Sequence, residues 1–174
     1  MTNELRTSYG GSFILENDRV QYGVKEIELP SFEREVMEDE DISSDAVIPI
    51  AGRLDVVEMT VTFSDDYPEA LDAYRFQKTP FPFKVLTSSE RRTGSGIAED
   101  SIAHICRGFV SESEGGTISQ SERPEPEFTI VLTYYQKLVN GVETQLFDVL
   151  AGGLTKSSGL AIGSTRRTNL GFSI

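Results

Sequence analysis

The chain has 174 residues, enough for one domain whose hydrophobic core needs neither disulfides nor metal. Its formal net charge of −12 argues against a protein that grips nucleic-acid phosphates, and its single cysteine, Cys106, excludes an intramolecular disulfide and a cysteine-based zinc cluster. No apolar run approaches the ~20 residues of a transmembrane helix, and Met1–Gly10 lacks the apolar core of a signal peptide. We therefore expect a single domain over residues 1–174, made in the cytoplasm and without membrane insertion.

The first part of the chain predicts two strands and an acidic segment. Ser12–Leu15 is a short strand candidate, and Val20–Leu29 resumes as a strand that Pro30 ends. Residues 31–45 are polar and acidic without sustained periodicity, which indicates an exposed loop or a flexible hairpin. Between residues 33 and 45, seven acids against one arginine hold half of the net charge. We expect residues 31–50 to form an exposed acidic loop.

The middle of the chain predicts a strand followed by a helix. Leu54–Phe63 is a strong strand candidate, and its apolar residues would share one face: Val57, Met59, Val61 and Phe63. Ser64-Asp65-Asp66 supplies side-chain oxygens that can cap a helix start. Tyr67–Phe76 is then the only credible helix of the chain.

The remaining elements are predicted strands and a basic tail. Phe81–Leu86 and Ile102–Val110 are strand candidates, and Glu127–Asp148 predicts a long β-hairpin in which Phe128, Ile130, Leu132 and Tyr134 form the buried face. Its turn would be Asn140-Gly141, a dipeptide suited to the two positive φ angles of a type I′ turn. Residues 151–174 contain no acid and form a basic C-terminal tail. Six or seven strands with one helix predict a mainly antiparallel β-sandwich or barrel with the helix packed at one end.

No residue pattern predicts a catalytic, metal or cofactor site. His104 is the only histidine and has no second donor at ligand spacing, so we interpret it as a structural or surface residue. Cys106 could act as a nucleophile only if His104 faced it. We take these neighbouring residues of one strand to face opposite sides of the sheet, which makes that pairing unfavourable. A buried free thiol is the better interpretation of Cys106. We expect neither enzymatic activity nor a cofactor.

The order of the elements resembles the tail tube (inner core) protein of contractile-tailed phages and of related phage-tail-like particles. The resemblance spans nearly the whole chain and rests on four stretches rather than on one motif. These are the strand ending Val24-Lys25-Glu26-Ile27-Glu28-Leu29-Pro30 with its acidic loop; Leu54–Phe63 with its helix; residues 103–135; and the Asn140-Gly141 hairpin with the tail Arg166-Arg167-Thr168-Asn169-Leu170-Gly171.

The resemblance implies a hexameric ring that stacks into a hollow tube, in which strands from six subunits form one continuous barrel. It implies a virion tail protein assembled in the host cytoplasm, with DNA passing through the lumen on ejection. The implied partners are other copies of the chain, the tail sheath protein, the tape-measure protein, and the baseplate and tail terminator proteins.

Two sets of residues are candidates for these roles. Strand faces polar enough to line a wet channel carry Glu58, Thr60, Thr62, Thr129, Thr133 and Lys137; the alternative is an ordinary solvent-exposed face. The acidic loop and the basic tail are candidates for contacts between rings or subunits, through Glu35, Glu38, Asp39, Glu40, Asp41, Arg166 and Arg167. For the loop, the alternative is simple disorder.

Three other functions compete with a phage tail tube. The inner tube of a non-phage contractile injection system or bacteriocin has the same fold and polymer with a different cargo. An acidic β-sandwich that binds carbohydrate or protein would stay monomeric or form a small closed oligomer, and it should show an exposed aromatic patch. An enzyme ranks last, because its acid/base centre would consist of carboxylates alone.

Overall fold

The computed structural model describes residues 6–15, 20–39, 48–63, 77–93, 96–115 and 125–162. Within these ranges the chain forms strands and no helix, and nothing in them could cross a membrane as a helix. The strands are β1 (Arg6–Leu15), β2 (Val20–Glu28), β3 (Arg34–Asp39), β4 (Ile48–Leu54), β5 (Glu58–Phe63), β6 (Phe81–Thr93), β7 (Gly96–Glu114), β8 (Glu127–Val139), β9 (Val142–Asp148), β10 (Gly153–Ser157) and β11 (Leu160–Ala161). The predicted helix at Tyr67–Phe76 lies outside the described residues.

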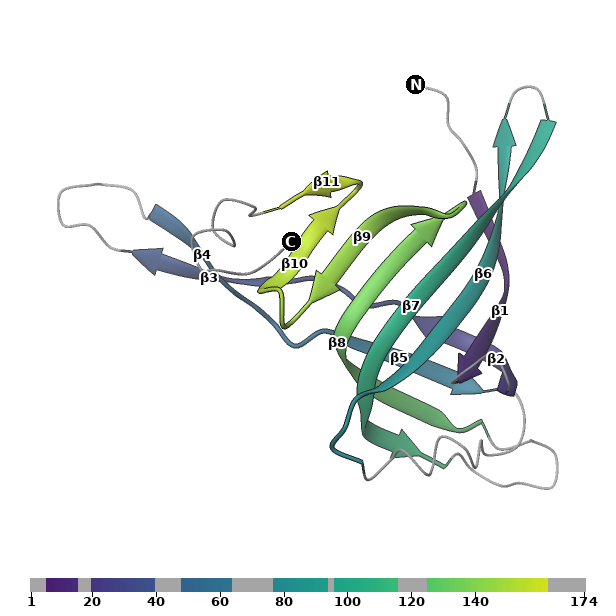
Figure 1. The fold of residues 1–174 in the computed structure, drawn as a ribbon, viewed down its shortest axis with the longest axis horizontal. Coiled ribbons are helices and arrows are strands. Elements are labelled where there is room, and N and C mark those ends of the chain that lie inside the picture. The colour runs from purple at the N-terminus through teal and green to yellow at the C-terminus, as the bar shows by residue number, and fades with distance from the viewer. Residues whose placement is uncertain are drawn as a thin grey trace.

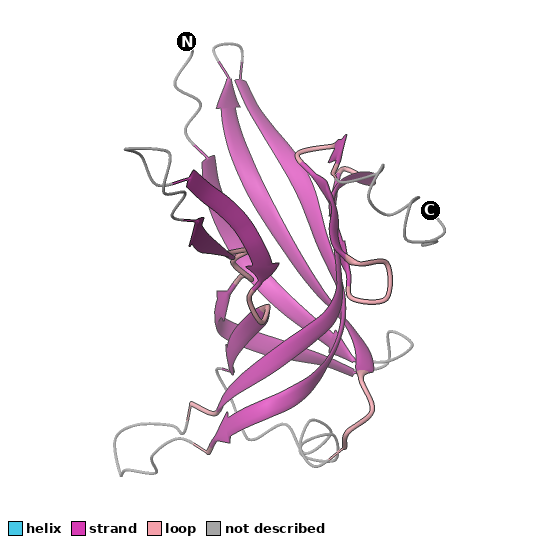
Figure 2. Ribbon diagram, turned by 90° about the vertical axis from the view of Figure 1, so that its left-hand side faces the viewer, coloured by secondary structure: helices cyan, strands magenta, loops and turns pink. Residues whose placement is uncertain are grey.

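Nine strands form one antiparallel sheet in the order β11-β10-β9-β8-β5-β2-β1-β6-β7, and β7 also pairs with β8. One edge of β8 pairs with β7, while its other edge pairs first with β5 and then, from Tyr134 on, with β9. The long strands bend strongly, so the sheet curls around a single core, and β9 to β11 extend it outward (Figures 1 and 2). The predicted class, mainly β and antiparallel, is confirmed as a curled sheet rather than a closed barrel.

The core lies inside the curl and is rich in phenylalanine. Phe13 of β1 packs against Phe83 of β6 with a centroid distance of 5.0 Å and against Phe63 of β5 at 5.5 Å. The predicted face of the strand before Phe63 is confirmed, since Val57, Met59, Val61 and Phe63 are all buried. Burying side chains of this size contributes roughly 1.5–3 kcal/mol each, so this cluster is the main source of stability.

The hairpin of β8 and β9 has the predicted turn. Asn140 and Gly141 have φ angles of 51° and 79°, as a type I′ turn requires. The Asn140 side chain also ties the turn to β7: its Nδ2 donates to Asp100 Oδ1 at 2.8 Å, and its Oδ1 accepts from Ser101 N at 2.9 Å. This end of the hairpin is therefore held by contacts between three strands.

A β-bulge changes which residues of β8 face the core. The register with β7 shifts at Arg107/Gly108, which leaves Thr133 as the extra residue of β8. Phe128, Ile130 and Leu132 are buried as predicted, but the next buried residue is Tyr135 and not Tyr134. The predicted alternation is wrong beyond this point, because one inserted residue moves every later side chain to the other face.

Strands β3 and β4 form a separate two-stranded sheet that extends away from the curled sheet (Figure 1). Within residues 31–50, the hairpin that we considered beside a loop is the observed form for residues 34–39 and 48–50. Glu33, Glu35 and Val36 are exposed on this arm. Because an isolated two-stranded hairpin is at best marginally stable in water, the arm is an element suited to packing against another molecule.

Candidate assembly surface

The interior of the sheet contains two buried side chains that the sequence had singled out, His104 and Cys106. His104 and Cys106 are 1% exposed and both lie on the inner face of β7, because they are two residues apart. Our prediction that they face opposite sides is therefore wrong, although the prediction of a buried thiol is confirmed. Burial raises the pKa of Cys106, so the unreactive thiol form dominates. No cluster of potential metal ligands occurs among the described side chains.

His104 predicts an acid-sensitive core. The Tyr135 hydroxyl lies 2.9 Å from its Nδ1, and burial, followed by the charge of Lys137, lowers the pKa of His104 from 6.5 to about 4. The folded protein then binds fewer protons than the unfolded chain between these values, so stability is retained above pH 6.5 and lost as the pH falls toward 4. We expect a loss of up to about 3 kcal/mol, measured by urea unfolding of the unassembled protein.

Because carboxylates also titrate near pH 4, the control is His104→Gln measured at the same pH values. The pH-dependent loss between 6.5 and 4 should be smaller in this variant by the histidine contribution. Equal losses in the two proteins would contradict the role of His104.

On the outer face, two rows of polar side chains cross four neighbouring strands, β2, β5, β8 and β7. Directly paired residues place Glu26, Thr62, Glu127 and Glu114 in the first row and Glu28, Thr60, Thr129 and Glu112 in the second. Five of these eight side chains are carboxylates and three are threonines. Exposed Glu58 lies on the same face of β5. We call these nine residues the acidic face.

Two carboxylates of the acidic face repel each other, and the packing of the core does not depend on either of them. Glu114 and Glu127 are directly opposite each other on β7 and β8, an arrangement that destabilises a sheet when both residues carry the same charge. Thr62 Oγ1 donates a long hydrogen bond of 3.5 Å to Glu127 Oε2, which offsets little of that repulsion. A negative surface that lowers the stability of the subunit points to a role in the assembled protein.

Replacing Glu127 by Gln is expected to stabilise the unassembled subunit. The change removes the repulsion with Glu114 and should raise the free energy of unfolding by about 0.2–1 kcal/mol, with a larger gain at low salt. Glu125→Gln is the matched control, because Glu125 forms an exposed ion pair with Lys25 and should gain nothing. A loss of stability in Glu127→Gln, measured by urea unfolding, would contradict the repulsion.

Both outer strands of the acidic face have a stretch whose outer edge is not covered by any described strand. β1 pairs with β2 only through residues 20–23, so no described strand pairs with the other edge of residues 24–28. β6 pairs with β7 only up to Gly108, so no described strand pairs with the outer edge of residues 109–114. Open edges of this kind are templates for pairing with another chain.

The structure brings together most of the predicted channel residues. Glu58, Thr60, Thr62 and Thr129 lie on the acidic face, and Thr133 lies in the bulge of β8, where its Oγ1 donates to the carbonyl of Arg107. Lys137 does not belong with them, because the bulge places it opposite His104 on the inner side of the sheet. Five residues of the face were missed: Glu26, Glu28, Glu112, Glu114 and Glu127. The sequence did contain a signal for them: these residues are spaced two apart within their strands, which places them on one face of the sheet.

The predicted contact residues divide between described and undescribed parts. Glu35, Glu38 and Asp39 lie on β3 of the arm. Glu40, Asp41, Arg166 and Arg167 lie outside the described residues. Of the predicted basic tail, residues 153–157 are strand β10, where Lys156 Nζ donates to Glu143 Oε1 at 3.1 Å.

Comparison with known families agrees with this architecture. The family model described as phage tail tube protein FII matches residues 12–171, which is nearly the whole chain. The chain belongs to this tail tube family. It is a structural protein of a virion tail, not an enzyme, and it assembles with other tail components.

Two further comparisons add little to the family assignment. No curated protein is similar enough in sequence to the tail tube chain to match it. Among solved structures, a chain of the "Cryo-EM structure of the anti-feeding prophage (AFP) baseplate, 6-fold symmetrised" resembles it with a TM-score of 0.48 and 10% identity, over 76% of this chain and 93% of that chain.

Proposed function

We propose that six copies of the chain form a ring, that the rings stack into the inner tube of a contractile tail, and that DNA is ejected through a lumen lined by the acidic face. The observation that carries this proposal is a four-stranded sheet whose outer face has two rows of glutamates and threonines, and whose two outer edges are not covered by any described strand. Ring closure gives both edges a partner and leaves the acidic face continuous around the inside.

The direction of the strands supports ring closure. β2, β5, β8 and β7 are successively antiparallel, so β2 and β7 run in opposite directions. Residues 109–114 of one copy can therefore pair antiparallel with residues 24–28 of the next copy, and the same contact repeats around the ring. Such a contact joins two different surfaces, which is the type that closes into a ring.

An acidic lumen suits passage rather than binding. Phosphates of DNA are repelled by carboxylates and find no Lys or Arg in the two rows with which to form contacts. The hydroxyl groups of the threonines can form hydrogen bonds with water in the lumen and add no charge to its wall. DNA would therefore pass along the lumen wall without binding tightly to it.

The remaining predicted contacts complete the proposal. The arm of β3 and β4 contacts the next ring through its acids, and Arg166 and Arg167 of another copy are partners of suitable charge. The sheath surrounds the tube, the tape-measure protein fills its lumen during assembly in the host cytoplasm, and the baseplate and tail terminator proteins bind its ends. The same architecture would serve a bacteriocin or another contractile injection system, and neighbouring genes distinguish these cargoes.

Electron microscopy of the concentrated protein tests the proposal. Negative stain should show hollow tubes or stacked rings with sixfold symmetry. In the same samples, a mixture of Glu26→Cys and Glu112→Cys chains should be linked by a flexible bismaleimide, whereas neither variant alone should be, and buried Cys106 gives little background. Monomers that form no rings even with baseplates added, or rings without this cross-link, would overturn the proposed edge pairing.

A further inference from the structure

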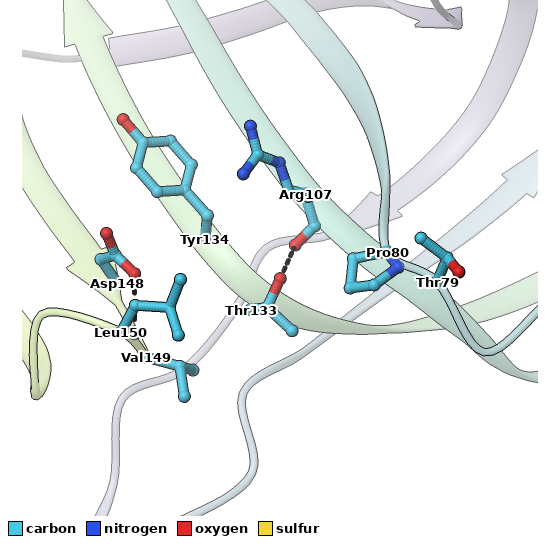
Figure 3. A pocket seen from close by; sticks show the side chains of 8 residues that line it. All are labelled: Thr79, Pro80, Arg107, Thr133, Tyr134, Asp148, Val149 and Leu150. Carbon is cyan, nitrogen blue, oxygen red and sulfur yellow. Dashed lines mark hydrogen bonds between the residues drawn. The ribbon is translucent and has the colours of Figure 1, made fainter.

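A hollow of about 450 Å³ lies on the outer side of the sheet, beside the acidic face (Figure 3). Tyr134 and Arg107 contribute from β8 and β7, Thr79-Pro80 lies at one side, and Val149-Leu150 lies at the other. Val149 also lines a second hollow of about 380 Å³ with Val56. The two hollows share Thr133 and Val149, and we call them together the groove; its lining is mostly apolar, with Arg107 as its cation and Asp148 and Asp55 as its acids.

One rim of the groove is the hydrogen-bonded turn after β9, which holds two apolar side chains exposed to solvent. Asp148 Oδ1 accepts a hydrogen bond from Leu150 N at 2.8 Å, and two further backbone bonds, from Ala151 N and Gly152 N, close the turn after β9. Leu150 is nevertheless 82% exposed and Val149 53% exposed. A leucine held in this way by a well-bonded turn is typical of a surface that another chain covers.

The geometry of the proposed ring indicates which segment arrives at the groove. If β2 of a neighbouring copy pairs antiparallel with residues 109–114, its C-terminal end points toward Gly108 and Arg107. From Phe81 onward β6 occupies that edge, so the incoming chain has to leave the plane of the sheet there. The packed core fills the inner side of the sheet. The incoming chain therefore leaves on the outer side, where it passes over Thr79-Pro80 into the groove.

We infer that the groove receives Leu29-Pro30 of the neighbouring copy, where the chain leaves β2 toward the arm; the inference rests on the proposed ring. Leu29 is 49% exposed in the subunit and supplies an apolar side chain of suitable size. Its packing against Leu150 and Tyr134 removes apolar surface of both copies from water.

Charge complementarity supports the same occupant. No carboxylate among the described residues forms an ion pair with Arg107, and this side chain is exposed at the groove. The exposed acids Glu28 and Glu33 flank the incoming segment. One of them can pair with Arg107 of the adjacent copy as Leu29 enters the groove.

Cross-linking between chains that each carry one added cysteine besides buried Cys106 tests this contact. Differently tagged Leu29→Cys and Leu150→Cys chains are mixed, assembled and treated with a mild oxidant. A mixed disulfide dimer between the two tags is expected, because the two side chains would touch across the interface. Leu160→Cys replaces Leu150→Cys as the matched control; Leu160 is 74% exposed but does not line the groove, so no mixed dimer is expected.

A second variant pair provides an independent measurement. Leu150→Asp should lower the association constant for assembly by at least about tenfold, whereas Leu160→Asp should change it less than about twofold. Sixfold rings that retain the Glu26→Cys/Glu112→Cys cross-link but give no Leu29–Leu150 cross-link would overturn the groove contact and leave the ring intact. Loss of both cross-links would overturn the proposed edge pairing, on which the groove contact rests.

Discussion

Gly108→Ala is expected to destabilise the subunit by about 3 kcal/mol or more, although it adds only one methyl group. An ideal Cβ at Gly108 would lie 2.4 Å from the carbonyl oxygen of Val131 and 2.9 Å from Cγ2 of Ile130. Gly108 is buried at the bulge between β7 and β8, so the backbone of β8 would have to shift to accommodate the methyl group. Urea unfolding of the unassembled protein measures the effect.

Gly115→Ala is the matched control for this prediction. Gly115 follows directly after β7, and a Cβ built there would contact nothing within 4 Å. Its unfolding midpoint should stay close to that of the unmodified protein. Similar midpoints for the two variants would show that the close contact at the bulge does not restrict the residue at position 108.

Tubes in which Glu112 and Glu114 are both replaced by Lys are expected to retain DNA. The change turns two acids into two bases on the proposed lumen wall of every subunit, and phosphates are then neutralised instead of repelled. We expect the association constant for a duplex oligonucleotide mixed in before assembly to rise at least about tenfold at low salt, and the gain to fall as salt is added. Co-sedimentation with the tubes measures the binding.

Nuclease treatment locates the DNA that is retained. DNA inside a lumen should be protected, whereas DNA bound by the control Glu90→Lys/Glu99→Lys, which changes two paired acids of β6 and β7 outside the acidic face and the groove, should be digested. Complete digestion of the DNA bound by the Glu112→Lys/Glu114→Lys tubes would place the acidic face on the outside. The proposal of an acidic lumen would then be wrong.

Local sequence patterns predicted the elements whose signals are short in range. The alternation before Phe63 and the turn at Asn140-Gly141 were both correct, because side-chain period and backbone φ preference are properties of adjacent residues. The sequence predicts the arm only in part: residues 31–50 are rich in charge and lack a clear two-residue period, so they are compatible with a loop as well as with a hairpin. Residues 67–76, predicted as a helix, stay untested.

The site depended on information that no single strand contains. The bulge at Thr133 exchanged Tyr134 for Tyr135 in the core and moved Lys137 away from the channel candidates, because an inserted residue is defined only against the partner strand. The rows of the acidic face likewise exist only after β2, β5, β8 and β7 are paired, so the carboxylates of β2 and β7 were not recognised as members of one surface.

The sequence by itself determined that this chain is an acidic, mainly antiparallel β-protein, and its resemblance pointed to the tail tube family, to which the chain belongs. These properties follow from composition, two-residue periodicity and turn chemistry, which are local. Only the tertiary structure decided which edges of the sheet stay open, which acids share a face, and where exposed Leu150 stands relative to them. Those features arise from strand register and curvature, and register is set by cross-strand packing between residues far apart in the chain.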